Sequence, residues 1–243
     1  MDTSVYLKTD ISDNILRITL NRPEKLNCFG IPELQAIQNI LEENETNPSV
    51  KAVKFSGAGK RSFSTGANLK QFKNLDRQGI AEWIKKGNDV FNYIEYYPKP
   101  TVAVIEGYAL GGGLELALSC DLRIASDNSI FGNPELSHGW LPGWGGIRRL
   151  KKIVGQSRTK ELIFLSKQIS AEEALRIGLI NQLSDSAELP AKANQLFENL
   201  IKVEPEIFAM AKAAISDPEY ANSSTSSGTW FDVLSTQYSK KLL

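Results

Sequence analysis

Short runs of β-branched residues alternate with stretches of helical spacing along the first half of the chain. Apolar residues recur every three or four positions in residues 31–41 and 80–94, so the sequence predicts an amphipathic helix in each, the first opened by Pro32. Strand-like runs precede and follow these helices at Ile15–Leu20, Lys51–Phe55, Thr101–Ile105 and Leu122–Ala125. Strands that alternate with helices are typical of an α/β fold.

Beyond Leu150 the spacing of apolar residues becomes mostly helical. The predicted helices cover residues 159–165, 171–177, 191–203 and 205–215. We therefore expect an α/β body followed by a helical C-terminal layer. The Ser-rich run at residues 223–228 predicts a surface loop.

The amino-acid composition limits the number of domains and the kinds of molecule that the protein can bind. The 243 residues are 42% hydrophobic and contain no low-complexity tract, so we expect one domain over residues 1–243. The 28 basic residues balance the 28 acidic ones, which excludes a bulk positive field for non-specific binding of nucleic acid or an anionic membrane. The N-terminus lacks the pattern of a signal peptide, and no apolar run reaches the ~18 residues of a spanning helix. A cytoplasmic protein is the resulting expectation.

Several familiar site signatures are missing. Cys28 and Cys120 are far apart and lie in no CxxC motif, and His138 is the single histidine, so we expect neither a disulfide nor a metal site. Residues 57–60 resemble the end of a phosphate-binding P-loop, but Arg61 follows the lysine where Ser or Thr is needed. The sequence also lacks GxGxxG and GxSxG motifs, which argues against a dinucleotide fold and a serine hydrolase.

The glycine turn at residues 111–113 leads directly into an apolar helix that ends near Cys120. Unpaired N–H groups at a helix start can hold an oxyanion, and glycine allows a ligand to approach closely. Glu115 is the one charged residue between Ala109 and Cys120. If Glu115 is buried, it needs a raised pKa or compensating partners. If it is exposed, it merely complements the positive end of the helix dipole. The local sequence does not distinguish between these two interpretations.

A second acid, Glu135, lies in the irregular stretch from Gly132 to Gly146, which carries several Pro and Gly residues. Such loops commonly carry function on a rigid scaffold, although an exposed loop carboxylate is the simpler interpretation. Trp140 and Trp144 flank Pro142-Gly143. They form either the wall of a pocket or ordinary loop packing. We expect His138 to be a hydrogen-bonded loop residue.

Several segments, in the same order, resemble the enoyl-CoA hydratase (crotonase) superfamily over about residues 14–215. The residues that carry the resemblance are Asn21–Pro23 with Asn27, Phe63–Ala67, Gly107–Ala117, Cys120-Asp121, Phe131–Glu135, Leu141–Gly143, and Ile169–Ala171 with Ala174 and Gly178-Leu179. The resemblance implies a crotonase-type spiral of repeated ββα units over about residues 1–190, with a helical C-terminal region over about 191–243. It also implies a homotrimer or hexamer.

The resemblance further implies an acyl-coenzyme A thioester as substrate, without a prosthetic group. Its carbonyl oxygen would be held by the N–H groups of Ala67 and Gly112, while Glu115 and Glu135 move water and protons at the enoyl group. The implied acyl pocket includes Trp140, Gly143 and Trp144. The implied contacts to coenzyme A are Lys25, Ser64, Thr65, Ala67, Leu69 and Lys70.

The sequence departs from the family pattern at four places, one of them Lys25, which lies one position later than the basic residue often found after the Arg-Pro pair. Asn68 stands where the family usually has Asp, Cys28 replaces a small residue after Asn27, and the C-terminal region is shorter than usual. The leading hypothesis is reversible hydration of a 2-enoyl-CoA to a 3-hydroxyacyl-CoA. The alternatives are an isomerase or decarboxylase of the same superfamily, which needs only Glu135, and a non-catalytic acyl-CoA-binding or scaffold protein.

Overall fold

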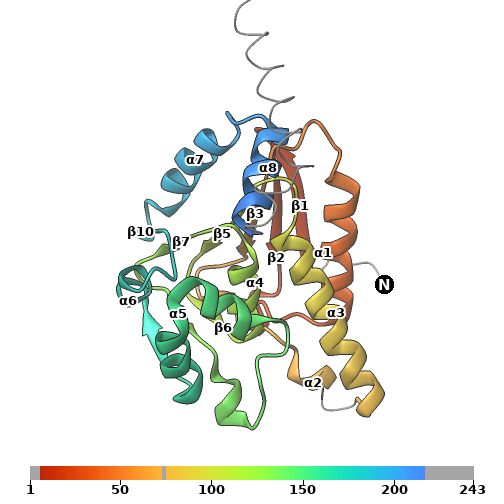
Figure 1. Ribbon diagram of the computed structural model, residues 1–243, viewed down its shortest axis with the longest axis vertical. Coiled ribbons are helices and arrows are strands. Elements are labelled where there is room, and N and C mark those ends of the chain that lie inside the picture. The colour runs from red at the N-terminus through yellow and green to blue at the C-terminus, as the bar shows by residue number, and fades with distance from the viewer. Residues whose placement is uncertain (1–5, 73–74, 217–243) are drawn as a thin grey trace, which may run out of the picture.

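Strands and helices follow one another in a repeating order. The computed structural model describes residues 6–72 and 75–216 (Figure 1). Its elements are β1 (Leu7–Ser12), β2 (Ile15–Leu20), η2 (Pro23–Lys25), α1 (Ile31–Asn44), β3 (Ala52–Gly57), β4 (Ser62–Ser64), α2 (Leu69–Phe72), α3 (Arg77–Glu95), β5 (Thr101–Ile105), β6 (Tyr108–Leu110), α4 (Gly112–Ser119), β7 (Leu122–Ser126), β8 (Ile130–Gly132), η3 (Pro134–His138), α5 (Gly146–Phe164), β9 (Gln168–Ser170), α6 (Ala171–Arg176), β10 (Gln182–Ser184), α7 (Leu189–Leu200) and α8 (Pro205–Ser216).

Within these residues the strands form two sheets. The six-stranded sheet has the order β1-β2-β3-β5-β7-β10, in which the β1–β2 pair is antiparallel and the other pairs are parallel. The four-stranded sheet has the order β4-β6-β8-β9, with β8 and β9 antiparallel. In three successive repeats, one strand joins the large sheet, the next joins the small sheet and a helix follows: β3-β4-α3, β5-β6-α4 and β7-β8-α5. The ββα repeat expected from the sequence is therefore present.

Helices cover both faces of the large sheet. One face packs against a large cluster that includes Phe55, Phe91 and Leu116, and α1 and α3 lie side by side along this part of the molecule (Figure 1). The opposite face packs against α7, where Phe197 belongs to the same apolar cluster as Val104. Because both faces are covered, all five residues of β5 are buried.

Most of the long elements lie where the sequence predicts them, but the six-residue β1, which is exposed except at Leu7, and the short strands were missed. Among the described residues, β4, β6, β8, β9 and β10 have three residues each, which is too short for a period of two to emerge. The region beyond Leu150 is mostly helical as expected, but it also contributes two short strands, β9 and β10, to the sheets. The helix expected at 159–165 is the end of α5, which begins at Gly146 and is interrupted at Gly155, with φ of 77°. The loop expected at residues 223–228 lies outside the described residues.

Candidate active site

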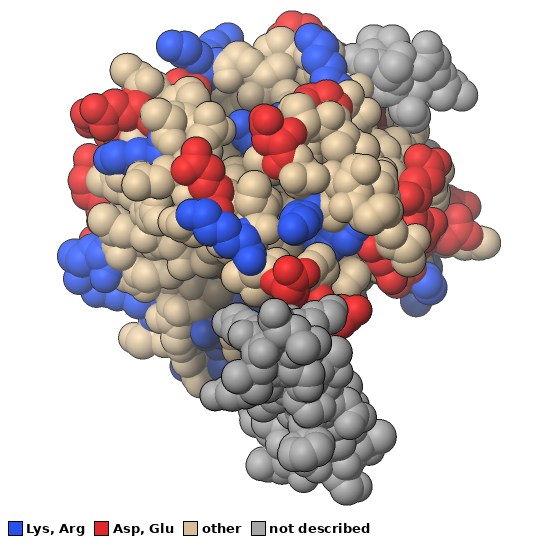
Figure 2. All heavy atoms as spheres, turned by 90° about the horizontal axis from the view of Figure 1, so that it is seen from above, with Lys and Arg blue, Asp and Glu red and all other residues tan. Residues whose placement is uncertain are grey.

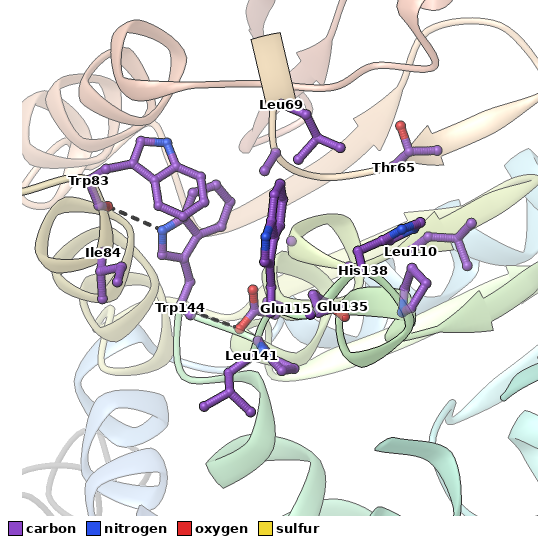
Figure 3. A pocket seen from close by; sticks show the side chains of 18 residues that line it. Thr65, Leu69, Trp83, Ile84, Leu110, Glu115, Glu135, His138, Leu141 and Trp144 are labelled. Carbon is purple, nitrogen blue, oxygen red and sulfur yellow. Dashed lines mark hydrogen bonds between the residues drawn. The ribbon is translucent and has the colours of Figure 1, made fainter. Parts of the chain in front are cut away.

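A cavity of about 710 Å³ opens beside the start of α4. Residues from four parts of the chain line it: the segment after β4, helix α3, the glycine turn with α4, and residues 134–144. Figure 3 shows Glu115 and Glu135 next to each other in this cavity, with Trp83, Ile84 and Trp144 on one side and Leu110 and His138 on the other. The structure thus brings together the two acids that the sequence singles out.

Glu115 lies in the first turn of α4 and is 2% exposed, so the interpretation as a solvent-facing residue is wrong. Its Oε1 accepts hydrogen bonds from the backbone N–H groups of Trp144, at 2.9 Å, and Gly146, at 2.8 Å. Figure 3 draws the first of these bonds. Two donors on one oxygen fix the direction of the carboxyl group, because rotation about its terminal bond would break both bonds.

Opposing influences set the pKa of the Glu115 carboxyl. Burial is the largest influence and raises this pKa, the nearby carboxylate of Glu135 adds to the rise, and the net value is about 7. The N–H groups of Gly146 and Trp144 and the positive charge of Arg149 act in the opposite direction. With a pKa near neutrality, the group can both accept and donate a proton at neutral pH.

Gly146 is needed for the close approach of this carboxyl group. A Cβ atom at position 146 would lie 2.6 Å from Cγ and 2.7 Å from Oε1 of Glu115, which is far inside contact distance. The glycine therefore lets the backbone N–H point at the carboxylate without a steric conflict.

Glu135 lies in η3 and is partly buried. Burial raises the pKa of its carboxyl group, and the charge of His138 partly opposes that rise. Its Oε2 is buried without a hydrogen-bond partner among the described residues. On the other side, a Cβ atom at Gly111 would lie 3.2 Å from its Oε1, so this carboxyl group faces the glycine turn. The simpler interpretation of an exposed loop carboxylate is therefore wrong.

The backbone at Gly66 and Gly112 forms the third part of the site. A Cβ atom on Gly66, whose φ is 82°, would lie 2.4 Å from the backbone nitrogen of Gly112, so the two segments touch. Neither Ala67 nor Gly112 donates its N–H to another group within residues 6–72 and 75–216. Both residues line the cavity. Two unpaired donors thus lie beside the two carboxyl groups.

Comparisons with known proteins agree with this arrangement. Residues 10–235 match the family model described as enoyl-CoA hydratase/isomerase. A short-chain-enoyl-CoA hydratase from Clostridium acetobutylicum is 39% identical over 82% of this chain and 76% of its own length. A crotonyl-CoA hydratase from Syntrophomonas wolfei is 35% identical, with the same coverage of both chains. The crystal structure of an enoyl-CoA hydratase from Bacillus anthracis has a TM-score of 0.86 at 30% identity, covering 96% of this chain and 90% of that one.

The chain belongs to the enoyl-CoA hydratase/isomerase family. The resemblance noted in the sequence is thereby confirmed, and so is the crotonase fold. Members of this family act on coenzyme A thioesters, so such a thioester is the ligand class to fit to the cavity.

The family site residues predicted from the sequence do not all reach the cavity. Thr65, Ala67, Leu69, Trp140, Gly143 and Trp144 line it. Lys25 and Lys70 are exposed and lie outside the lining. Ser64 is fully buried; its hydroxyl donates to the carbonyl of Asn27, at 2.8 Å, and accepts from Gly66 N–H, at 2.9 Å. Ser64 thus supports the turn before Ala67.

The two tryptophans of the loop differ in their surroundings. Trp144 is 1% exposed and packs between Phe29, with ring centroids 5.6 Å apart, and Trp83, at 4.3 Å. Its indole N–H donates to the carbonyl of Trp83. Trp140 is partly exposed, and its backbone N–H donates to the carbonyl of Glu135. Trp144 therefore belongs to the core and the cavity wall at once.

Sequence reasoning missed Trp83, Ile84 and Leu110, which also line the cavity. Trp83 and Ile84 lie in the apolar periodicity of residues 80–94, where nothing distinguishes a pocket residue from a core residue. Asn68, the departure from the family pattern, donates its N–H to the carbonyl of Phe29 and accepts from Lys70 N–H at 3.3 Å. It orders the start of α2.

The described residues contain no group of three or more His, Cys, Asp or Glu side chains placed to hold a metal ion. In the same part of the chain, no helix combines the length and the apolar character that crossing a membrane requires.

Proposed function

We propose that this protein catalyses the reversible hydration of a 2-enoyl-CoA thioester to a 3-hydroxyacyl-CoA. The observation that carries the proposal is the pair of Glu115 and Glu135 in one cavity beside unpaired backbone donors. Relatives named short-chain-enoyl-CoA hydratase and crotonyl-CoA hydratase support the same reaction.

In this mechanism the carboxylate of Glu115 takes a proton from water while the water oxygen bonds to C3 of the enoyl group. The π electrons move toward the thioester carbonyl, which becomes an enolate oxygen. The carboxyl group of Glu135 then gives its proton to C2, and dehydration runs through the same steps in reverse. A pKa of Glu115 of about 7 and a raised pKa of Glu135 suit two groups that must each exchange a proton near neutral pH.

The N–H groups of Ala67 and Gly112 would donate to the developing enolate oxygen. Donors fixed in place before the reaction stabilise such an oxygen by about 2.7–4 kcal/mol each. The start of α4 adds the positive end of its helix dipole at the same point. Glu115 thus activates the attacking water, while the backbone N–H groups stabilise the negative charge that develops on the thioester oxygen.

The proposal includes the finer expectations from the sequence. Coenzyme A would pass along Thr65, Ala67 and Leu69 toward the exposed ammonium groups of Lys25 and Lys70, which suit phosphate. The acyl group would lie against Trp140, Gly143 and Trp144. Residues 1–243 would form a single domain that assembles as a homotrimer or hexamer in the cytoplasm.

The first test is a hydration assay with crotonyl-CoA, which follows the loss of absorbance of the conjugated thioester. We expect turnover by the wild type and a loss of about 10²–10⁴ in kcat for Glu115→Gln and for Glu135→Gln, because each removes a proton-transfer group. Glu82→Gln, on the exposed face of α3, is the control and should keep full activity. An unchanged rate in both active-site variants would overturn the mechanism.

Analysis of the product by mass separates the alternatives. Hydration adds one water to the thioester, whereas an isomerase leaves the mass unchanged and a decarboxylase removes carbon dioxide. Acyl-CoA binding by calorimetry without turnover of any enoyl-CoA would indicate a binding protein.

The variant Gly66→Ala tests the role of the two backbone donors, the N–H groups of Ala67 and Gly112. The added Cβ would lie 2.4 Å from Gly112 nitrogen and push the two segments apart, so we expect kcat to fall about 10²-fold or more. Gly59→Ala is a matched control, because Gly59 also has a positive φ, 76°, but its Cβ would meet only Pro23, at 3.4 Å. Equal activity of the two variants would contradict a role for this contact.

A further inference from the structure

A buried arginine lies behind the loop that holds Glu115. Arg149 is 2% exposed, and each of its three guanidinium nitrogens donates a hydrogen bond. Nη1 donates to the carbonyl of Trp144 at 2.7 Å, Nε donates to Glu95 Oε2 at 2.8 Å, and Nη2 donates to Asn92 Oδ1 at 2.7 Å. The guanidinium thus ties the loop to the end of α3.

The loop at residues 144–146 is held from both sides. Its N–H groups at Trp144 and Gly146 point to Glu115 Oε1, while the carbonyl of Trp144 points to Arg149. Gly145 lies between them with φ of 86°, and a Cβ there would lie 2.5 Å from Nη1 of Arg149. Any movement of Arg149 therefore shifts the peptide groups that orient the Glu115 carboxylate.

We propose that Arg149, anchored by Glu95 and Asn92, is a positioning residue for Glu115: it fixes the loop that orients this carboxylate and places a buried positive charge near it. This inference rests on the proposed function, in which Glu115 moves the proton of water. A planar guanidinium suits the task because its donors point in three fixed directions, whereas an ammonium group offers no such fork.

Two charged side chains act on the carboxyl group of Glu115 in opposite directions. Glu135 raises the pKa of Glu115 and Arg149 lowers it. Arg149 itself is paired with Glu95, which also binds Arg148 and, at 3.4 Å, Lys152 from the solvent side. Because a buried guanidinium stays charged, Arg149 keeps its influence over the whole working range of pH.

Arg148 supplies a matched control. It binds the same Glu95 and, at 3.1 Å, the same Asn92 as Arg149, but its side chain is 42% exposed and makes no hydrogen bond to the loop at 144–146. Arg148→Met and Arg149→Met therefore remove the same charge from the same network, and only the second removes the contact with the loop.

The pH profile of kcat/KM is the first readout. With Arg149→Met we expect the acidic limb to move to higher pH by about half a unit or more, since a stabilising positive charge is lost, and kcat to fall about tenfold or more. Arg148→Met should match the wild type in both. Arg149→Lys should keep the position of the limb, because the charge remains, but lose kcat, because one ammonium group cannot serve the three partners.

A second readout does not depend on activity. The carboxyl carbon of Glu115, assigned in ¹³C-labelled protein by its absence in Glu115→Gln, gives its titration midpoint by NMR. We expect a higher midpoint in Arg149→Met than in Arg148→Met. If the wild type hydrates no enoyl-CoA, the proposed function fails while this measurement still decides the inference. Should Arg149→Met not fold, Arg149→Lys carries the test through kcat. An Arg149 variant with the kcat, pH profile and titration midpoint of Arg148→Met would overturn the inference.

Discussion

The carboxyl group of Glu115 is buried, and two backbone donors and the charge of Arg149 compensate it only in part. Such a group costs stability once it is ionised, because the folded chain must keep a charge away from water. Its raised pKa of about 7 measures that cost. A glutamine of the same shape would avoid it, so the acid is retained here at the expense of stability.

Glu115→Gln should accordingly be more stable than the wild type at neutral pH. An unfolded glutamate has a pKa of about 4.3, and the folded value is about 7, so between them the folded chain holds the proton more tightly. Wild-type stability therefore falls as pH rises through this window, by about 4 kcal/mol in total. The variant lacks this slope.

Urea unfolding at pH 4 to 8 checks the prediction. The difference in free energy of unfolding between variant and wild type should be small at pH 4 and grow to its full value above pH 7. A difference that stays constant with pH would show that Glu115 titrates normally in the folded chain.

At the scale of elements, an ion pair between the buried Lys212 and the partly buried Asp121 links α8 to the body. Lys212 is 9% exposed, and its ammonium lies 2.9 Å from the carboxylate of Asp121. That carboxylate also accepts from the N–H and hydroxyl of Thr101, at 2.8 and 2.9 Å, at the start of β5. A single lysine thus links the last described helix to the central strand of the large sheet.

Lys212→Met should loosen α8 without unfolding the sheets. The partly buried carboxylate of Asp121 keeps its two donors from Thr101, so we expect a cost of about 1–2 kcal/mol rather than the larger loss of an unpaired buried charge. Hydrogen exchange at residues 205–216 should accelerate more than in β5. Lys202→Met, at an exposed position, is the control. Unchanged exchange in α8 would show that its apolar contacts suffice.

The sequence predicts elements well where one face is long and regular. The helix expected at residues 80–94 is α3, Arg77–Glu95, and the strand expected at residues 101–105 is β5. β6 and β8 could not be predicted, since their three residues are specified by pairing with each other, as in Ala109 with Phe131. These strands therefore depend on tertiary contacts and not on the local sequence.

The same distinction applies to the site. Glu115 stood out as a lone charge in an apolar helix, so its burial could be anticipated. Arg149 could not be found this way, because it follows the exposed Arg148 in a basic run and nothing local separates the two. Its partner Glu95 lies 54 residues earlier. Only the fold brings α3 and α5 together.

At the scale of the whole molecule, charge is spread rather than concentrated. Figure 2 shows positive and negative side chains interspersed on the face seen from above, in keeping with equal numbers of basic and acidic residues. An anionic substrate would therefore be met by local groups and not drawn in by a general positive field. Long-range attraction, with its strong dependence on salt, should contribute little to acyl-CoA binding.

One adjacent pair of exposed apolar side chains bears on the proposed assembly. Phe164 and Leu165, at the end of α5, are 67% and 69% exposed, and two adjacent large apolar side chains in water are costly unless a partner covers them. Identical copies that bury such a surface around a closed axis form a ring of defined size. For the homotrimer or hexamer proposed above from the family resemblance, analytical ultracentrifugation should give three or six times the 26.9 kDa of one chain.

Replacing both residues by glutamate should break that assembly, since charges placed in an apolar interface lose their hydration without gaining a partner. The mass should fall toward 26.9 kDa while the far-ultraviolet circular dichroism stays unchanged, because neither side chain packs in the core. Val203→Glu, at a 40% exposed position after α7, should leave the mass as in the wild type. A wild type that sediments as one chain would contradict the assembly itself. A double variant that keeps the wild-type mass would place the interface elsewhere on the surface.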